Sequence, residues 1–393
     1  MPMMELRSVS DFFRGKTILV TGATGFLAKV FVEKILRVQP DIKKLYLLVR
    51  ASDPYLATQR LHNEVFKKDL FRVLQDKWGA NFDSFISKKV VAVAGDVSRD
   101  MLGFIDVKLS EEMLKEINII VNSAATTNLD ERFDVAMGTN TVGAFNVLNF
   151  AKSCQKIEII LHVSTAYVCG QGEGLIAEEP IHMGQTLNKC RRLDINLEKQ
   201  LIQEKLSELR AQNANEETIT KTMKKFGMIR TMDFLIAAYC QGTLTSFVGH
   251  SDTVLDTIPA DMVVNSMFIA LLAHSKNHFK NLIYHSASSL RNPFKFSDLQ
   301  DIMYSYFTKN PWVDQYGKPV VVTKKLTLCS TSMDELPLNK FDDQNAEKLR
   351  IATKGVQGMN EEFNFDPRDV NWKDYMMNIH LPGLVKYSIR SKM

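Results

Sequence analysis

Short apolar runs alternate with longer amphipathic stretches through the first half of the chain. The apolar runs, mostly of β-branched residues, stand at residues 17–20, 45–49, 90–94, 119–122 and 159–164. Stretches with helical spacing lie between them at residues 26–38, 53–74 and 142–152. Short uncharged strands are typical of the centre of a parallel sheet. The alternation predicts right-handed βαβ units and an α/β fold built on a doubly wound parallel sheet.

The second half of the chain predicts more helix than strand. Leucines recur at helical spacing among charged residues over 193–210, and residues 216–226 continue the pattern. Pro259 precedes a further helix expected at residues 260–274. The pattern changes near residue 286, and Asn292-Pro293 is a turn signal. We therefore expect one large domain over residues 1–285 and a small, mainly helical domain over residues 286–393.

Composition excludes several classes of function. Lys plus Arg (49) nearly balance Asp plus Glu (45), and the net charge of +4 is spread along the chain, which argues against nucleic-acid binding. Five widely spaced cysteines indicate a reducing compartment. Glu5 and Asp11 are atypical of a secretory signal, and no run approaches the ~18 apolar residues of a membrane span. We expect an intracellular protein, soluble or peripherally attached, with no signal peptide or transmembrane helix.

A glycine-containing loop follows the first strand and opens a helix. Gly22 allows a tight turn, Gly25 lets the backbone approach a pyrophosphate, and Ala28 lets the helix pack closely on the sheet. Free N–H groups at the helix start then face the anion. The loop therefore predicts dinucleotide binding. Its expected contact residues are Thr21, Gly22, Thr24, Gly25, Phe26 and Leu27.

Arg50 stands at the end of the second predicted strand. An acidic residue near this position binds the ribose 2′-hydroxyl of NAD, whereas a basic residue accommodates the 2′-phosphate of NADP. Arg50 therefore favours NADPH. The alternative interpretation is a solvated arginine at a strand end.

Further candidates follow the third and fourth strands. Asp96 could accept a hydrogen bond from the adenine amino group with help from the Val97 backbone, although aspartate also suits a turn cap. Ala124 and Thr126 belong to a run of small residues that would let a ligand lie against the backbone. Close packing without a ligand would favour the same small residues.

Three polar residues are candidates near the reacting groups. Asn140 is expected to be a buried structural asparagine that also helps to order an active-site water. Ser164 and Thr165 end the fifth strand, where a hydroxyl could polarise a substrate carbonyl or simply form a turn. The histidines show no metal-ligand spacing, so we expect no metal site.

Together these motifs resemble the extended short-chain dehydrogenases/reductases. The motifs are Gly22-x-x-Gly25-x-x-Ala28, Gly95-Asp96, Asn140-x-x-Gly143 and Ser164-Thr165. Longer segments narrow the resemblance to the plant alcohol-forming fatty acyl-CoA reductases. They are residues 26–30, 124–132, 162–168, 258–265, 365–367 and 380–383. The likeness covers nearly the whole chain.

The resemblance implies a function and a cellular setting. It implies NADPH-dependent reduction of a long-chain fatty acyl-CoA, first to an aldehyde and then to a primary alcohol, in lipid biosynthesis of the wax or suberin type. It assigns residues 1–285 to the reductase domain and residues 286–393 to the family's C-terminal domain. It also implies peripheral association with the endoplasmic reticulum or another organelle. Acyl chain length and oligomeric state are left open.

The family resemblance also implies a Tyr-x-x-x-Lys motif on a helix after the fifth strand. The tyrosine would donate the proton to the carbonyl oxygen, and the lysine would lower the tyrosine pKa and hold the nicotinamide ribose. None of the ten tyrosines of this chain has a lysine four positions later. Tyr46 lies inside the second predicted strand and is followed at this spacing by Arg50. Tyr167 is followed at this spacing by Gln171.

Two places in the chain join segments that lie apart in the family. The resemblance implies that the catalytic helix, the next sheet strand and its loop are missing between Arg230 and Thr231. It also implies a second shortening between Leu328 and Phe341. Loss of a general acid typically removes ~10²–10⁴ in rate. A missing strand also predicts an exposed sheet edge and apolar surface. Three hypotheses stay open: a reductase, a non-catalytic dinucleotide- or acyl-binding remnant, and the product of a mis-spliced gene model.

Overall fold

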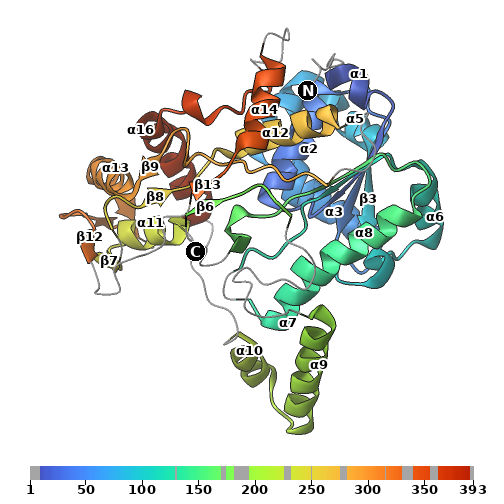
Figure 1. The fold of residues 1–393 in the computed structure, drawn as a ribbon, viewed down its shortest axis with the longest axis horizontal. Helices are drawn as coiled ribbons and strands as arrows, with labels where there is room; N and C mark the ends of the chain where they lie inside the picture. The colour runs from blue at the N-terminus through green and yellow to red at the C-terminus, as the bar shows by residue number, and fades with distance from the viewer. Residues whose placement is uncertain are drawn as a thin grey trace.

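Five parallel strands form the central sheet of the protein (Figure 1). The computed structural model describes residues 9–128, 131–169, 174–180, 194–224, 232–248, 250–274, 281–314, 316–329, 340–354 and 362–389. The strands are β1 (Thr17–Thr21), β2 (Lys44–Val49), β3 (Val90–Ala94), β4 (Ile119–Asn122) and β5 (Ile159–His162). Their order is β3-β2-β1-β4-β5, and every neighbouring pair is parallel. The predicted doubly wound sheet is confirmed.

Successive side chains of each strand enter opposite layers of the core. Ile18 and Val20 face the layer that contains α2 (Phe26–Val38) and α12 (Ala260–Ala273). Leu19 lies between them in sequence and faces the layer of α6 (Val107–Glu116) and α8 (Gly143–Ser153). The sheet is therefore covered by helices on both faces, and its strands are apolar throughout for that reason.

The expected long helix over residues 53–74 is wrong. Asp53 caps α3 (Pro54–Leu61) by accepting a hydrogen bond from the Leu56 amide at 2.8 Å, but the helix does not continue to residue 74. A π-helical turn η1 (His62–Phe66) follows, Lys68 is extended, and the chain then enters η2 (Asp69–Phe71) and α4 (Arg72–Trp78). Phe66 and Phe71 pack edge to face at 5.3 Å across this bend, so burial of two aromatic rings overrides helix propensity.

The other expected elements hold with small shifts of their ends. Residues 159–164 form a strand only as far as His162. The helices expected at 193–210 and 216–226 are α9 (Ile195–Ala211) and α10 (Glu216–Lys224). Shorter helices in the first half are α1 (Val9–Phe13), η3 (Gly79–Asn81), α5 (Phe82–Lys89), η4 (Asp100–Gly103), α7 (Phe133–Ala136), η5 (Met137–Val142) and η6 (Ala166–Cys169).

The second half of the chain adds short strands and a second core. The strands are β6 (Leu175–Ile176), β7 (Ser246–Val248), β8 (Val254–Leu255), β9 (Phe294–Lys295), β10 (Trp312–Val313), β11 (Pro319–Val320), β12 (Thr327–Cys329) and β13 (Lys340–Phe341). The helices are α11 (Met232–Cys240), α13 (Phe296–Lys309), α14 (Gln344–Thr353), η7 (Pro367–Asp369), α16 (Trp372–Tyr375), η8 (Met376–His380), α17 (Leu381–Leu384) and η9 (Val385–Ile389). Ile236 on α11 packs with Phe307 and Met376, so this core joins segments far apart in sequence.

Helices α9 and α10 project away from the rest of the molecule as a hairpin (Figure 1). Leu209, Ile219 and Met223 form a small core between the two helices. The hairpin is joined to the rest of the molecule at the start of α7, because the Arg132 guanidinium lies 3.2 Å from the Glu216 carboxylate. Within the described residues, no helix reaches the length and apolarity that crossing a membrane requires.

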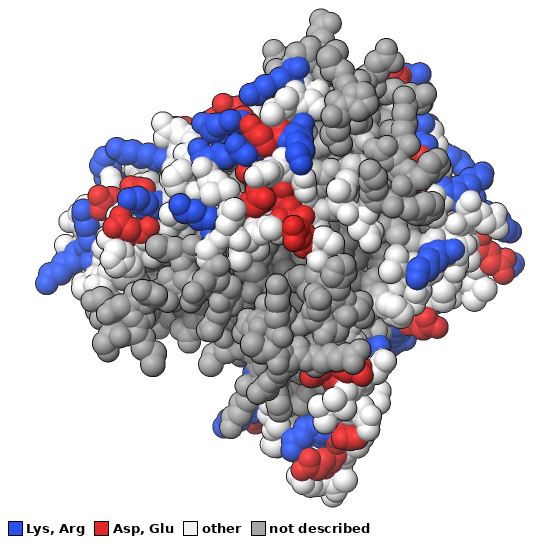
Figure 2. Space-filling view, viewed as in Figure 1, with Lys and Arg blue, Asp and Glu red and all other residues white. Residues whose placement is uncertain are grey.

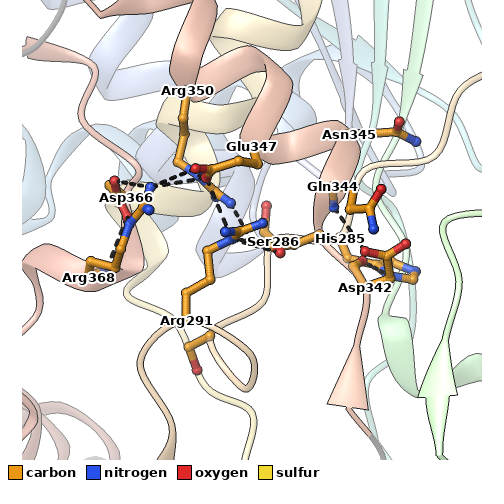
Figure 3. Close-up of polar contacts among 12 residues, drawn as sticks. His285, Ser286, Arg291, Asp342, Gln344, Asn345, Glu347, Arg350, Asp366 and Arg368 are labelled. Carbon is orange, nitrogen blue, oxygen red and sulfur yellow. Dashed lines mark hydrogen bonds and ion pairs between the residues drawn. The ribbon is translucent and has the colours of Figure 1, made fainter.

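Charged side chains of both signs are interspersed on the visible face of the molecule (Figure 2), in keeping with the small net charge. The most buried charged side chains of the described residues form an ion-pair network around α14 (Figure 3). The side chains of Asp343 and Arg350 are only 1% and 3% exposed and are paired with each other. Arg291 approaches Asp343 at 2.7 Å, and Glu347 joins Arg350 to Arg368. The network fastens α14 to the segment that follows residue 286.

Arg350→Met is expected to destabilise the protein by about 3–5 kcal/mol, because it leaves the Asp343 carboxylate buried with less charge compensation. Urea unfolding would measure the change. Arg368→Met is the matched control, since its side chain is 39% exposed and exposed pairs contribute about 1 kcal/mol or less. Equal losses for the two variants would contradict the assignment of the network's strength to burial.

Candidate functional site

The carboxyl ends of β1 and β4 lie side by side at the centre of the sheet. The two strands are hydrogen-bonded in register, with Thr21 opposite Asn122, although some hundred residues separate them in sequence. The chain leaves β1 toward β2 on one side and leaves β4 toward β5 on the other. Ligands of open α/β sheets bind at such a switch point, where the loops diverge and leave a crevice.

The glycine loop occupies this switch point. Gly22 has a φ of +66°, and a Cβ atom added there would lie 2.7 Å from the Ser123 carbonyl oxygen. The turn closes with a hydrogen bond from the Gly25 amide to the Gly22 carbonyl at 2.8 Å. Gly25 is the N-cap of α2. Because glycine has no side chain, the first amides of that helix receive no side-chain cap from it. The first N–H groups of α2 are therefore available to a ligand. The close backbone contact beside them is one that only glycine permits.

A buried threonine hydroxyl joins the two strand ends beneath the loop. Thr21 Oγ1 lies 2.5 Å from Asn122 Oδ1, to which it donates, and accepts from the Ser123 and Ala124 amides at 3.2 and 3.1 Å. Asn122 then points its Nδ2 at His162 Nδ1, 2.9 Å away on β5. Thr21 was expected to contact the cofactor. The structure buries its side chain as the support of the loop, and its contact with the cofactor stays a prediction.

The other loop residues lie around the start of α2. Thr24 and Leu27 are half-buried, and Phe26 is largely exposed. Ala28 is buried against the sheet, as the close approach of helix and sheet requires. Lys29 is a neighbour that the sequence reasoning missed. Burial, and then the nearby charge of Lys68, lower the pKa of the Lys29 ammonium.

Arg50 and Asp96 end neighbouring strands of the sheet, since β2 and β3 pair up to Val49 and Ala94. Arg50 is exposed, and its carbonyl oxygen accepts a hydrogen bond from Arg60 at 2.6 Å. Asp96 accepts from the Ser98 amide and hydroxyl at 2.9 and 2.8 Å, which is the turn-cap arrangement. Its contact with adenine stays a prediction.

Val97 is buried, and its carbonyl oxygen is held by Asn146 of α8 at 2.9 Å. Asn146 also binds the Arg99 carbonyl at 3.0 Å, so one amide fixes the loop after β3. The signal for it was an asparagine on the apolar face of a predicted helix, three residues after Gly143. Sequence reasoning did not use that signal.

Thr126 and Asn140 bind each other. The Thr126 amide donates to Asn140 Oδ1 at 2.8 Å, and Asn140 Nδ2 donates to the Thr126 carbonyl at 3.1 Å. The expectation of a buried Asn140 is wrong, because the residue is exposed. Both of its amide atoms nevertheless bond to the Thr126 backbone, so its structural role is to hold the segment after β4. Ala124 lies at the Thr21 contact described above.

Ser164 and Thr165 are exposed just beyond β5. Val163 donates to the Asn122 carbonyl at 2.9 Å, which brings this segment to the switch point. Thr165 Oγ1 accepts from the Tyr167 amide at 3.2 Å, the turn-forming role. The Tyr167 hydroxyl donates to the Asp256 carbonyl at 3.1 Å, so it is directed at backbone. Partial burial lowers the pKa of His162, which favours the neutral imidazole.

The described residues hold no group of three or more His, Cys, Asp or Glu side chains placed to bind a metal. The expected break at residues 230 and 231 lies outside the described residues, as does most of the second shortening. The sheet nevertheless ends at β5 among the described strands. Ile160 on β5 is 37% exposed, and Phe145 and Leu148 on α8 are exposed as well. Among the described residues, β5 is therefore an edge strand with exposed apolar side chains beside it, and its origin in a missing strand stays a prediction.

Solved structures share this fold. The reductase domain of a non-ribosomal peptide synthetase from Mycobacterium tuberculosis matches 97% of each chain with a TM-score of 0.55 and 15% identity. The terminal R domain from the myxalamid biosynthetic pathway covers 90% of this chain and 79% of its own, with a TM-score of 0.50 and 19% identity. The fold that they share with this chain is a doubly wound α/β sheet with helices on both faces.

Sequence comparison defines the family. An NAD-binding family model described as male sterility protein matches residues 20–226. The alcohol-forming fatty acyl-CoA reductase of Simmondsia chinensis is 39% identical over 98% of this chain and 99% of its own length. Fatty acyl-CoA reductase 8 of Arabidopsis thaliana is also 39% identical, over 98% of this chain and its whole length. The chain belongs to the plant fatty acyl-CoA reductase family, a family of oxidoreductases.

The alignments are longer than this chain. They extend over 490 and 496 positions, whereas the chain has 393 residues. Close to a hundred aligned positions or more therefore have no residue here.

Thr21→Val should weaken both folding and dinucleotide binding. The substitution keeps the side chain's shape but removes the partner of Asn122 and of two loop amides, at about 1–3 kcal/mol for each buried group left unsatisfied. Chemical unfolding and fluorescence titration with the cofactor would measure the two effects.

Thr17→Val is the matched control on the same strand. Thr17 is equally buried, and its Oγ1 has no hydrogen-bond partner in the structure, so this change should be neutral or stabilising. If Thr21→Val proved as harmless as Thr17→Val, Thr21 would not be the support of the loop.

Proposed function

We propose that this chain binds NADPH at the switch point between β1 and β4 and is a long-chain, alcohol-forming fatty acyl-CoA reductase with very low turnover. The observation that carries the proposal is the Gly22 turn, which meets the Ser123 carbonyl so closely that no side chain could replace the glycine. Such a turn at the start of α2 suits a pyrophosphate. The bound dinucleotide would supply hydride, and the residues of this chain would bind and orient it.

Arg50 supports NADPH as the form of the cofactor. It stands directly after β2 with an exposed side chain, and Arg60 holds its carbonyl oxygen. Arg60 is itself fixed by two contacts with Glu64, at 2.6 and 2.9 Å. A guanidinium at this strand end would bind a 2′-phosphate with two hydrogen bonds, whereas the ribose hydroxyl of NADH would offer it no anion.

A long-chain fatty acyl-CoA is the proposed substrate. The names of the relatives describe fatty acyl-CoA reductases, and one of them describes formation of the alcohol. Ser164 and Thr165 provide exposed hydroxyls beside the switch point, where they would polarise the carbonyl of the thioester and then of the aldehyde. The division at residue 285 into reductase and C-terminal domains belongs to the same proposal.

The proposed low turnover follows from the missing proton donor. None of the ten tyrosines has a lysine four positions later. The relatives align over close to a hundred or more positions that this chain does not fill. Loss of the strand and helix that would follow β5 is supported by its place at the edge of the sheet among the described strands. Without a general acid we expect a rate ~10²–10⁴ lower than that of a complete relative.

A non-catalytic role in binding the dinucleotide or an acyl group is the second candidate. The same absence of Tyr-x-x-x-Lys favours it, together with the direction of the Tyr167 hydroxyl toward backbone. Either candidate is compatible with peripheral membrane association. That part of the proposal is supported by Leu197 and Leu201, which lie exposed one turn apart on the projecting α9 (Figure 1).

Arg50→Ala should weaken NADPH binding at least tenfold and leave NADH binding nearly unchanged, since only NADPH carries the 2′-phosphate. Isothermal titration with each nucleotide would measure this. Arg210→Ala, an exposed arginine on α9, should change neither affinity. Equal losses for NADPH and NADH would remove Arg50 as the phosphate partner.

Inserting between Arg230 and Thr231 the segment of the Simmondsia chinensis reductase that would carry the Tyr-x-x-x-Lys motif should raise alcohol formation from acyl-CoA and NADPH by ~10²–10⁴. Product analysis of the purified proteins, with and without the insert, would measure it. Alcohol formation by the unaltered chain at the rate of the relative would overturn low turnover. Sequencing transcripts across this junction would show whether the short form is expressed, which decides the mis-splicing hypothesis.

A further inference from the structure

The outer edge of β5 carries backbone groups that point away from the sheet. In the parallel ladder with β4, the amides of Ile159 and Val163 donate to the carbonyls of Asn118 and Asn122. Alternate residues of a strand direct their N–H and C=O groups to opposite sides. Ile160 and His162 therefore direct theirs outward, and no described strand pairs with them. An unpaired edge of this kind is a template for another strand.

The side chains beside this edge are apolar. Ile160 is 37% exposed on the α8 side of the sheet, because its neighbours Ile159 and Leu161 pack toward the opposite layer. On α8, Asn146 faces the loop after β3 through its bonds to Val97 and Arg99. Residues two apart stand about 160° round a helix, so Leu148 lies on the flank toward β5. Its side chain is 42% exposed.

We propose that two copies of this chain associate by pairing their β5 edges antiparallel about a two-fold axis at Ile160. The two central sheets would then form one continuous sheet, with Ile160 opposite Ile160 and the Leu148 side chains flanking the junction. A two-fold interface needs a surface that complements itself. The β5 segment meets this requirement in its backbone, because the outward N–H and C=O of Ile160 match those of the same residue in the second copy.

The polar ends of the strand complement each other in the same register. Pairing about Ile160 places Glu158 of one copy opposite His162 of the other. His162 Nδ1 faces the Asn122 amide nitrogen, so it accepts that bond and the ring proton resides on Nε2. This Nε2–H can donate to a carboxylate. Glu158 lies on the same side of the strand as Ile160 and His162, where Lys16 holds its carboxylate at 2.5 Å.

Pairing of the two edges would also bury the apolar surface that the shortened chain is expected to expose. The inference concerns only β5 and α8, so it stands or fails independently of NADPH binding and of turnover. A strand of four residues buries little area. We therefore expect a reversible dimer whose population depends on concentration.

Sedimentation velocity of the full chain over a range of micromolar concentrations tests the proposal. The unaltered chain should form a dimer, and Ile160→Pro should weaken it at least tenfold by removing an outward donor while sparing the ladder with β4. Leu148→Asp should weaken the dimer similarly. Because Leu148 is at an exposed helix position, this variant keeps the test valid if the proline variant fails to fold. Val107→Asp is the control, since Val107 is 68% exposed on α6, away from this edge.

Cross-linking tests the register. The Ile160→Cys variant should form an intermolecular disulfide under mild oxidation, because residues directly opposite in a hydrogen-bonded pair lie ~5.5 Å apart at Cα, within disulfide reach. The Val107→Cys variant and the unaltered chain should not. A monomer at all concentrations overturns the proposal, and so does a dimer unaffected by both Ile160→Pro and Leu148→Asp. A dimer that both variants weaken, with a cross-link at residue 160, supports it.

Discussion

The contact between the ends of β1 and β4 is the constraint on which the rest of the site depends. These ends are neighbours in space because a right-handed crossover places β2 on one side of β1 and leaves the other side to β4. Thr21 then fills the space under the loop and binds three groups of the β4 end. The tight turn at Gly22 can touch Ser123 only because this hydroxyl holds the two backbones together.

Polar residues extend this constraint outward from strand to strand. Asn122 is hydrogen-bonded to His162 on β5, and Asn146 fixes the loop after β3. Each is a buried or half-buried amide whose donor and acceptor groups are matched by a specific partner. Such groups are costly to bury unpaired, so they specify a single arrangement of the loops around the crevice. The proposed cofactor site would thus be preorganised by side chains that need not touch the cofactor.

Local patterns predicted most of the sheet and the glycine loop. Short apolar runs, mostly β-branched outside β2, mark the strands, and the spacing of Gly22, Gly25 and Ala28 reports contacts within one βα unit. The break at Lys68 and the exposure of Asn140 were not predictable in this way. The first depends on two aromatic rings that meet only after the chain bends, and the second on a loop from another strand. The polar networks were missed because each joins residues far apart in sequence.

The pairing of β6 with β13 joins the segment after β5 to the C-terminal part of the chain. Glu178, just after β6, accepts from the His285 amide at 2.7 Å and from Asn345 at 2.5 Å in the first turn of α14. Tyr167 packs edge to face on Phe341 at 5.2 Å. The segment that carries Ser164 and Thr165 is thereby clamped by residues near position 340. The C-terminal part of the chain therefore supports the segment beside the proposed site. Separating that part from the sheet is expected to loosen the segment of Ser164 and Thr165 before the sheet unfolds.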